Sequence, residues 1–177
     1  MTGLTAFTVL VALVAVERLA ELVVSKRNAA WSLAHGGRES GRGHYPVMVV
    51  LHTGFLAAML VEAHLRRPDV APVLAWSMLV LVLAAQALRW WCIAVLGRQW
   101  NTRVIVVPGL DAVRSGPYRW LRHPNYVAVV VEGVALPLVH GAWITAVAFT
   151  VLNAALLTVR LRVENAALAS LEEPARA

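Results

Sequence analysis

The sequence predicts an all-α, polytopic integral membrane protein with five transmembrane helices. Hydrophobic residues make up 59% of the 177 positions and charged residues only 15%, whereas soluble domains average about half and about a quarter. The apolar residues collect in runs long enough to cross a bilayer, and most basic residues lie between these runs. Residues 1–177 are therefore expected to form a single membrane domain.

The first three apolar runs are each long enough to span. A hydrocarbon core of about 30 Å needs about 20 helical residues, because lipid offers the backbone no hydrogen-bond partners. Residues 4–24, 47–65 and 70–96 are close to this length. Glu17, Arg18 and Glu21 interrupt the first run, so we expect them to face inward and form polar pairs.

The region after Pro124 is predicted to be a helical hairpin. Apolar residues 126–139 and 142–159 flank a turn at His140 and Gly141. The first of these runs is short for a span and Pro137 disturbs its end, so a re-entrant segment is the alternative. Five spans are preferred, and four stay open.

Two basic segments predict the orientation. With five spans, residues 25–44 and 98–123 lie on the same side of the membrane, together with the C-terminus. Both segments are rich in Lys and Arg, whereas the His140–Gly141 turn has neither. The positive-inside rule therefore predicts a multi-pass protein of the cell membrane, with the C-terminus in the cytoplasm and the N-terminus outside.

Several other classes of protein fit the sequence poorly. The net charge of +6 comes from residues scattered between apolar runs, so no nucleic-acid partner is expected. Cys92 has no second cysteine with which to form a disulfide or a zinc site. His44, His52 and His64 lack a recognised ligand spacing, and no metal is expected.

The most informative segment is residues 116–126, with the sequence GPYRWLRHPNY. Pro124 suits the first turn of a following helix, whose free N–H groups and positive dipole end attract anionic groups. Arg119 and Arg122 suit either a carboxylate or phospholipid headgroups. The tyrosines and the tryptophan either wall an adenine pocket or form an interfacial aromatic belt.

Three ionisable residues in the fourth apolar run or at the end of the last one are candidates for function. An ionised carboxylate such as Glu132 is costly in lipid unless it is paired or faces a wet cavity, so it indicates a functional or pocket-supporting role. Arg160 and Glu164 are four residues apart and share a helix face. An ordinary interfacial ion pair is the alternative interpretation of these two.

In order and spacing, these residues resemble the isoprenylcysteine carboxyl methyltransferase family of integral membrane enzymes. The resemblance covers residues 89–168 and rests on residues 96–100 (LGRQW), residues 116–126, Glu132 and residues 160–164 (RLRVE). The N-terminal half is similar to a small bacterial branch of that family. Some members of this branch accompany type III polyketide synthases.

The resemblance implies S-adenosylmethionine as the cofactor, in a pocket at the cytoplasmic face. It assigns a catalytic or pocket role to Glu132, Arg160 and Glu164. It assigns cofactor binding to Gly116, Tyr118, Arg122, His123, Pro124 and Tyr126. The sequence has no GxGxxG fingerprint of a dinucleotide-binding fold, which is compatible with this class of membrane enzyme.

The expected activity is O-methyl transfer to an amphipathic, lipid-like acceptor, with the hydroxyl of a long-chain polyketide phenol or pyrone preferred. Such a hydroxyl needs help in losing its proton, which Glu132, Glu164 or His123 could give, whereas a carboxylate is already ionised. The alternatives are carboxyl methylation of a prenylated-cysteine-type substrate, an NADPH-dependent membrane reductase, and a non-enzymatic membrane adaptor. The expected partners are the acceptor, membrane lipids and, functionally, a type III polyketide synthase.

Overall fold

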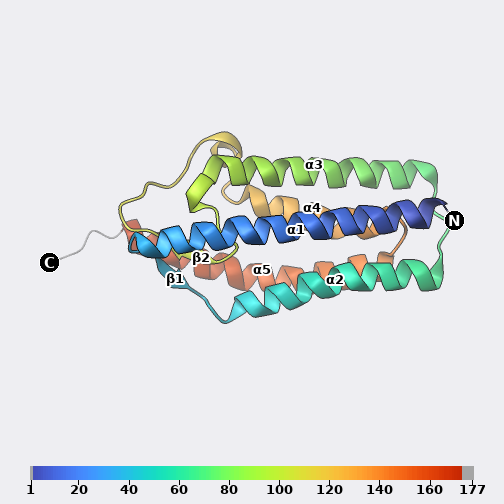
Figure 1. Cartoon of the computed structure of the whole chain (residues 1–177), viewed down its shortest axis with the longest axis horizontal. Coiled ribbons are helices and arrows are strands. Elements are labelled where there is room, and N and C mark those ends of the chain that lie inside the picture. Colours follow the sequence, from blue (N-terminus) through green and yellow to red (C-terminus); the bar gives the residue numbers. More distant parts are fainter. Residues whose placement is uncertain (1, 173–177) are drawn as a thin grey trace.

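The computed structural model describes residues 2–172 as a bundle of five helices that alternate in direction (Figure 1). The chain therefore begins at one end of the bundle and finishes its last helix at the other. The helices are α1 (Thr2–Ala34), α2 (His44–Arg66), α3 (Pro72–Leu96), α4 (Pro124–Leu138) and α5 (Trp143–Glu172). Two short 3-10 helices, η1 (Gly97–Gln99) and η2 (Gly116–Arg119), lie between α3 and α4.

A small antiparallel sheet joins the two basic segments. Strand β1 (Arg38–Ser40) pairs with β2 (Val104–Val106), and Glu39 lies opposite Ile105. The Glu39 carboxylate contacts Arg42 at 3.3 Å and Arg103 at 3.6 Å, so it bridges the two segments. The sequence did not predict these strands, because three residues are too few to show an alternating pattern. The sheet confirms that both segments lie at one end of the bundle, which we call the sheet end.

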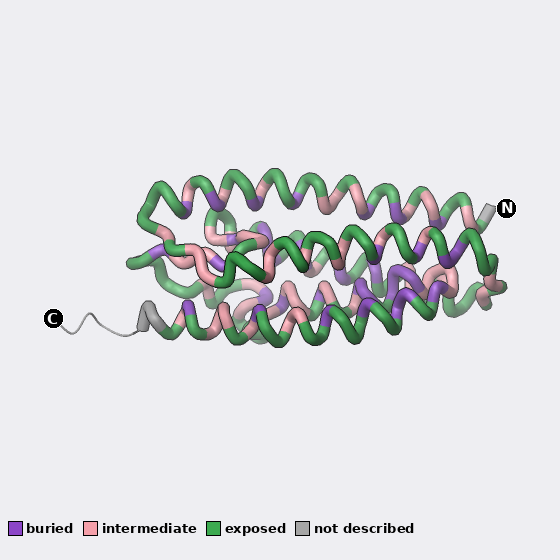
Figure 2. Tube along the Cα trace, turned by 90° about the horizontal axis from the view of Figure 1, so that it is seen from below, coloured by how far each residue is buried: buried purple, intermediate pink, exposed green. Residues whose placement is uncertain are grey.

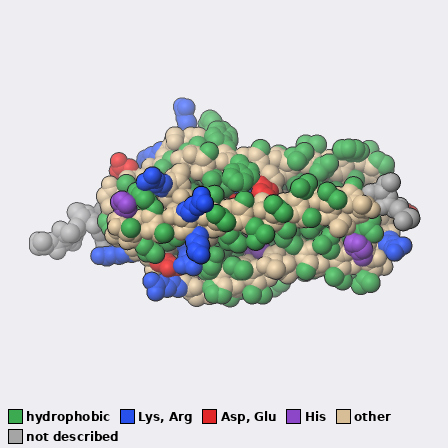
Figure 3. Space-filling model, viewed as in Figure 1, with side chains coloured by type: hydrophobic (Ala, Val, Ile, Leu, Met, Phe, Trp, Pro, Cys, Tyr) green, Lys and Arg blue, Asp and Glu red, His purple; other side chains and the backbone are tan. Residues whose placement is uncertain are grey.

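The outer surface of the bundle is apolar. A core of buried side chains that includes Phe7, Met59 and Leu136 lies inside, while many Val, Leu and Trp side chains point outward. Figure 2 shows the exposed residues along the outer sides of the helices. Figure 3 shows most of the visible Lys and Arg side chains at the sheet end, with apolar side chains over the long face beside them. This distribution is what a lipid environment favours, since an exposed apolar face of this size is unusual on a soluble monomer.

Within the described residues, three helices are long and apolar enough to cross a membrane: His44–Arg66, Pro72–Gln99 and Trp143–Ala169. The prediction of a helical membrane protein is thereby confirmed, while the count of five spans and the orientation stay predictions. Helix α1 continues to Ala34, ten residues beyond the apolar run that ends at residue 24. Lys26 and Arg27 of the first basic segment therefore lie on a helix and not in a loop. Its Glu21 is buried, and Leu13 and Leu19 on the same helix are exposed.

The predicted hairpin after Pro124 is confirmed, because α4 and α5 flank a turn at His140 and Gly141. Gly141 has a φ of 67°, and a Cβ there would lie 2.9 Å from Val70 Cγ2. Pro137 falls in the last turn of α4, where the helix is about to end. The turn therefore needs glycine both for its backbone and for its close contact with the loop before α3.

The start of α5 is held by a carboxylate from α2. Glu62 Oε2 accepts hydrogen bonds from the backbone N–H and the hydroxyl of Thr145, each at 2.7 Å, and Glu62 Oε1 accepts from the N–H of Ile144 at 3.1 Å. Free N–H groups at a helix N-terminus are stabilised by a negative charge. These bonds fix the register of α5 against α2, and so the position of the residues further along α5.

Candidate functional site

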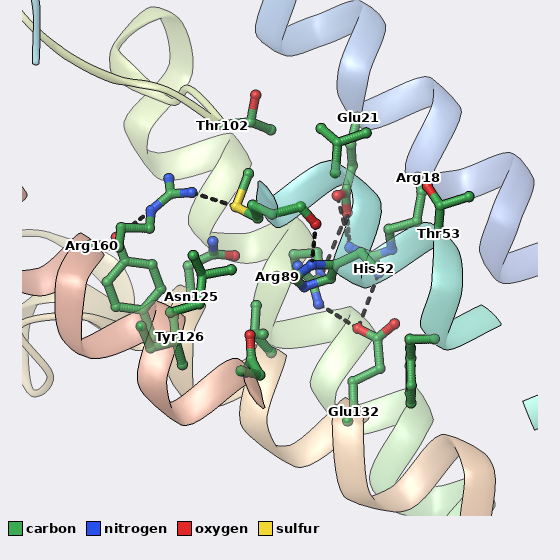
Figure 4. Close-up of a pocket in the computed structure, with 18 of the residues that line it drawn as sticks. Arg18, Glu21, His52, Thr53, Arg89, Thr102, Asn125, Tyr126, Glu132 and Arg160 are labelled. Carbon is green, nitrogen blue, oxygen red and sulfur yellow. Dashed lines mark hydrogen bonds and ion pairs between the residues drawn. The ribbon is translucent and has the colours of Figure 1, made fainter. Parts of the chain in front are cut away.

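A cavity of about 170 Å³ lies between the helices, and all five contribute to its wall (Figure 4). Most of the wall is apolar, and polar groups gather in two places. The apolar lining residues are Leu22, Met48, Val49, Phe55, Leu56, Trp100, Val129, Phe149, Leu156 and Leu157.

The first polar group is a buried ion-pair network in the middle of the bundle, made by Arg18, Glu21, Arg89 and Glu132. Arg18 donates to both carboxylate oxygens of Glu21, at 2.9 and 2.7 Å, and to Glu132 Oε2 at 3.1 Å. Arg89 also donates to Glu132 Oε2, and its Nε lies 3.6 Å from Glu21 Oε1. The network therefore ties α1, α3 and α4 together.

Neighbouring polar residues extend this network. Arg18 Nη2 donates to Gln86 Oε1 at 2.7 Å, and Gln86 in turn donates to Glu17, which also accepts from Trp90 Nε1. Charges in a membrane interior are tolerated only when they are paired or hydrogen-bonded. The expected inward pairing of Glu17, Arg18 and Glu21 is thus confirmed, and Glu132 is engaged by two guanidinium groups.

The second polar group lies towards the sheet end and is centred on a hydroxyl; we call Tyr126, Arg160, Glu164 and His123 the tyrosine cluster. Arg160 Nε donates to the Tyr126 hydroxyl at 2.7 Å, and that hydroxyl donates to Glu164 Oε2. The imidazole of His123 stacks on the Tyr126 ring, and its Nδ1 lies 3.5 Å from Glu164 Oε1. Arg160 and Glu164 therefore meet through Tyr126, which joins the start of α4 to α5.

Gly116 allows the segment before α4 to pack closely on α3. It has a φ of 55°, and a Cβ at this position would lie 2.7 Å from Val95 Cγ2. Tyr118 follows in η2 beside Cys92; burial, and then that thiol, raise the pKa of the Tyr118 phenol above its usual range. Tyr118 therefore stays a neutral hydrogen-bonding group.

Pro124 is fully buried at the first position of α4, and no side chain caps that helix. Pro124 has no N–H and the Tyr126 N–H donates to the His123 carbonyl oxygen at 3.1 Å, so the backbone N–H of Asn125 is the donor that the start of α4 offers next to the tyrosine cluster. Arg119 and Arg122 are exposed and do not line the cavity, which suits contact with phospholipid headgroups. Of the predicted cofactor residues, Tyr126 lines the cavity and His123 stacks on Tyr126, whereas the Arg122 side chain does not line the cavity.

Sequence reasoning missed three asparagines and one arginine of the cavity wall. Arg89 lies inside a run that was treated as uniformly apolar, yet it is 6% exposed and central to the ion-pair network. Asn101, Asn125 and Asn153 line the cavity, and each has a buried amide atom with no hydrogen-bond partner in the described part of the chain. For Arg89 and Asn153 the available signal was an isolated polar residue in an apolar run, because such residues are costly in lipid without a function or a partner. Asn101 and Asn125 lie outside the apolar runs and gave no such signal.

The sequence pattern of the isoprenylcysteine carboxyl methyltransferase family matches residues 78–170. The chain belongs to this family. The match contains the ion-pair residues Arg89 and Glu132 and the whole tyrosine cluster. Members of the family are membrane methyltransferases, and they use S-adenosylmethionine in general.

Two relatives extend the likeness to the N-terminal half. The uncharacterized protein YpbQ of Bacillus subtilis is 37% identical over 163 residues, which cover 92% of this chain and 96% of the relative. An uncharacterized protein of Haemophilus influenzae is 24% identical over 155 residues, which cover 87% of this chain and 90% of the relative. No solved structure matches the chain.

Proposed function

We propose that this protein transfers the methyl group of S-adenosylmethionine to an oxygen of an amphipathic, lipid-like acceptor at the membrane. The observation that carries the proposal is the tyrosine cluster, in which Arg160 and Glu164 meet on the Tyr126 hydroxyl at one end of an apolar cavity. The family supports the reaction type, and the cavity supports an acceptor with a polar head and an apolar chain.

The residues of this site suit the chemical groups of S-adenosylmethionine. Its sulfonium and ammonium cations need negative charge or aromatic faces, and Glu164 with the stacked rings of His123 and Tyr126 offers both. Its carboxylate suits the positive dipole end at the start of α4, where the Asn125 backbone N–H can donate. The buried amides of Asn101 and Asn125 offer hydrogen bonds to the adenosine portion, and so does the Nε2 of His123, which has no hydrogen-bond partner among the described residues.

When bound, the cofactor supplies an electrophilic methyl group. The chain has to hold the acceptor oxygen in line with that group, because alignment provides much of the rate in such a transfer. Arg160 and Glu164 fix the Tyr126 ring through hydrogen bonds with its hydroxyl, and the apolar walls exclude water from the reacting atoms. The ion-pair network keeps α1, α3 and α4 in register around this space.

The acceptor we favour is the hydroxyl of a long-chain polyketide phenol or pyrone, made by a type III polyketide synthase. Its ring would face the polar part of the cavity and its chain the apolar residues of α2 and α5 and the surrounding lipid. Carboxyl methylation of a prenylated-cysteine-type substrate is the alternative within the same reaction class. The proposal includes five spans and puts the sheet end in the cytoplasm, where the cofactor is made available.

The test is binding and transfer by the purified full-length protein in detergent. We expect binding of S-adenosylmethionine by calorimetry, and transfer of its labelled methyl group to an alkylresorcinol or an alkylpyrone. Glu164→Gln should weaken cofactor binding by about tenfold or more, the effect of losing a hydrogen bond to a charged group. No binding of S-adenosylmethionine by the folded wild-type protein, or competition by NADPH, would contradict the proposal.

The matched control is Glu39→Gln. Glu39 is also a carboxylate at the sheet end, but it pairs with Arg42 and Arg103, which do not belong to the tyrosine cluster. This variant should bind the cofactor like the wild type. An equal loss in both variants would indicate a general effect of charge at this end of the bundle and not a role of Glu164 in the site.

A further inference from the structure

His52 connects the two polar groups of the cavity. It lies on α2 four residues after Met48, and both side chains line the cavity. Met48 Sδ accepts from Arg160 Nη1 at 2.8 Å, so Met48 adjoins the tyrosine cluster. Residues four apart share a helix face and are about 6 Å apart along the axis. His52 is drawn beside Arg89 and Glu132 in Figure 4, one turn further into the bundle.

The hydrogen bond of His52 determines which of its nitrogens is free. Its Nδ1 lies 2.9 Å from the Met48 carbonyl oxygen, which can only accept, so Nδ1 carries the proton and donates. The ring stands edge-on to Phe149, with centroids 5.2 Å apart and planes at 87°, which fixes its orientation. In the neutral ring Nε2 then has a lone pair. No hydrogen bond or ion pair joins Nε2 to another residue of the described part of the chain.

The other titratable groups that face His52 are already engaged. Arg18 of α1, Arg89 of α3 and Glu132 of α4 act on it electrostatically, and α5 presents the apolar ring of Phe149. Both arginines donate to Glu132, and Arg18 also pairs with Glu21. The unpaired basic atom in this part of the cavity wall is His52 Nε2.

We propose that His52 is the general base of the methyl transfer, and that the acceptor is a weakly acidic hydroxyl. This inference rests on the proposed function. The hydroxyl proton passes to Nε2, the oxygen electron pair forms the O–CH₃ bond, and the S–CH₃ bond breaks with its electrons remaining on sulfur. The imidazolium then returns its proton to water. A carboxylate acceptor, ionised at neutral pH, would need no such base.

His52→Asn tests the assignment, because its amide can still donate to the Met48 carbonyl but cannot take a proton. We expect unchanged binding of S-adenosylmethionine and a fall in kcat of about 10²–10⁴-fold with an alkylresorcinol, the usual contribution of a general base. With an alkyl-4-nitrophenol that is already ionised at the assay pH, kcat should stay close to that of the wild type. His52→Gln, which places an amide near the Nε2 position, should behave the same way and replaces His52→Asn if the latter does not fold.

The matched control is His64→Asn. His64 also lies on α2, and its Nδ1 makes the same bond to a carbonyl four residues earlier, to Leu60 at 2.8 Å, but it is exposed and outside the cavity. This substitution should leave kcat unchanged with either acceptor. A spectroscopic measurement without cofactor, at a pH low enough that the free alkyl-4-nitrophenol is mostly neutral, complements the kinetics. The wild type should raise the ratio of ionised to neutral bound nitrophenol, relative to His52→Asn, by about tenfold, the effect of one pKa unit.

Equal losses with both acceptors, no loss with the alkylresorcinol, or transfer to carboxylates alone would overturn the role of His52 and leave the methyltransferase proposal standing. Absence of cofactor binding by the wild-type protein would instead overturn the proposed function, and the inference with it.

Discussion

The Glu132 carboxylate holds two guanidinium groups in the interior of the bundle, and Glu132→Gln removes its charge while keeping its shape. Glu132 Oε2 accepts from Arg89 and from Arg18, and the side chains of Glu132 and Arg89 are each 8% exposed. Removing one partner from a buried ion pair costs about 3–5 kcal/mol, because the other charge stays buried without compensation. Arg18 is 19% exposed and keeps Glu21. We therefore expect Glu132→Gln to lower the free energy of unfolding by an amount at the lower limit of this range, about 3 kcal/mol.

For a chain of this length, 1 kcal/mol corresponds to about 2–4 °C in Tm, so Glu132→Gln should lower Tm by about 6–12 °C. Circular dichroism of the protein in detergent measures this shift. The control is Arg42→Gln, which breaks the ion pair with Glu39, because Arg42 is 78% exposed. Exposed pairs contribute about 1 kcal/mol or less, so this variant should lose at most about 4 °C.

A Tm of Glu132→Gln equal to that of Arg42→Gln would refute the reasoning that the network stabilises the bundle. A double-mutant cycle with Arg89→Gln measures the coupling directly, since the second substitution should cost much less once Glu132 has lost its charge. Cofactor binding should survive, because the tyrosine cluster does not depend on the Glu132 carboxylate. Loss of binding at unchanged stability would make Glu132 a cofactor ligand.

Three further predictions concern packing, binding and pH. Gly133→Ala should destabilise the protein by about 1–3 kcal/mol in thermal melts, because its Cβ would lie 2.5 Å from the buried ring of Phe149. Tyr126→Phe should weaken S-adenosylmethionine binding about tenfold by calorimetry, since Arg160 and Glu164 lose their shared hydroxyl. Burial lowers the pKa of His140 below its ordinary value of 6.5. As the pH falls, His140 is therefore protonated in the unfolded chain before it is protonated in the folded protein, and Tm should fall between about pH 7 and pH 5. His140→Asn should make that decline shallower.

Each of these predictions has a comparison that can contradict it. Gly54→Ala is the packing control, because nothing lies within 4 Å of a Cβ at Gly54 in α2. Equal stability of the Gly133→Ala and Gly54→Ala variants would show that Phe149 moves aside. Unchanged cofactor affinity in Tyr126→Phe would remove the tyrosine cluster from the binding site. An identical pH dependence of Tm in His140→Asn and the wild type would assign the acid loss of stability to other groups.

Much of the fold follows from local features of the sequence. Long apolar runs predict membrane helices because the backbone must satisfy its own hydrogen bonds in lipid, and His140 with Gly141 marks the turn of the last hairpin because glycine alone suits that backbone and its close contact. The order of residues 116–126, Glu132, Arg160 and Glu164 predicted the family. The extension of α1 to Ala34 and the pairing of β1 with β2 were missed, because neither is marked by an apolar pattern.

The sequence by itself thus determined that this chain is a helical membrane protein of a methyltransferase family, since apolar run length and motif order are properties of neighbouring residues. Only the tertiary structure decided which polar residues meet. It brought Arg89 from the middle of an apolar helix onto Glu132, placed Tyr126 between Arg160 and Glu164, and turned His52 towards the same cavity. These residues lie far apart along the chain, and the packing of the five helices creates their contacts.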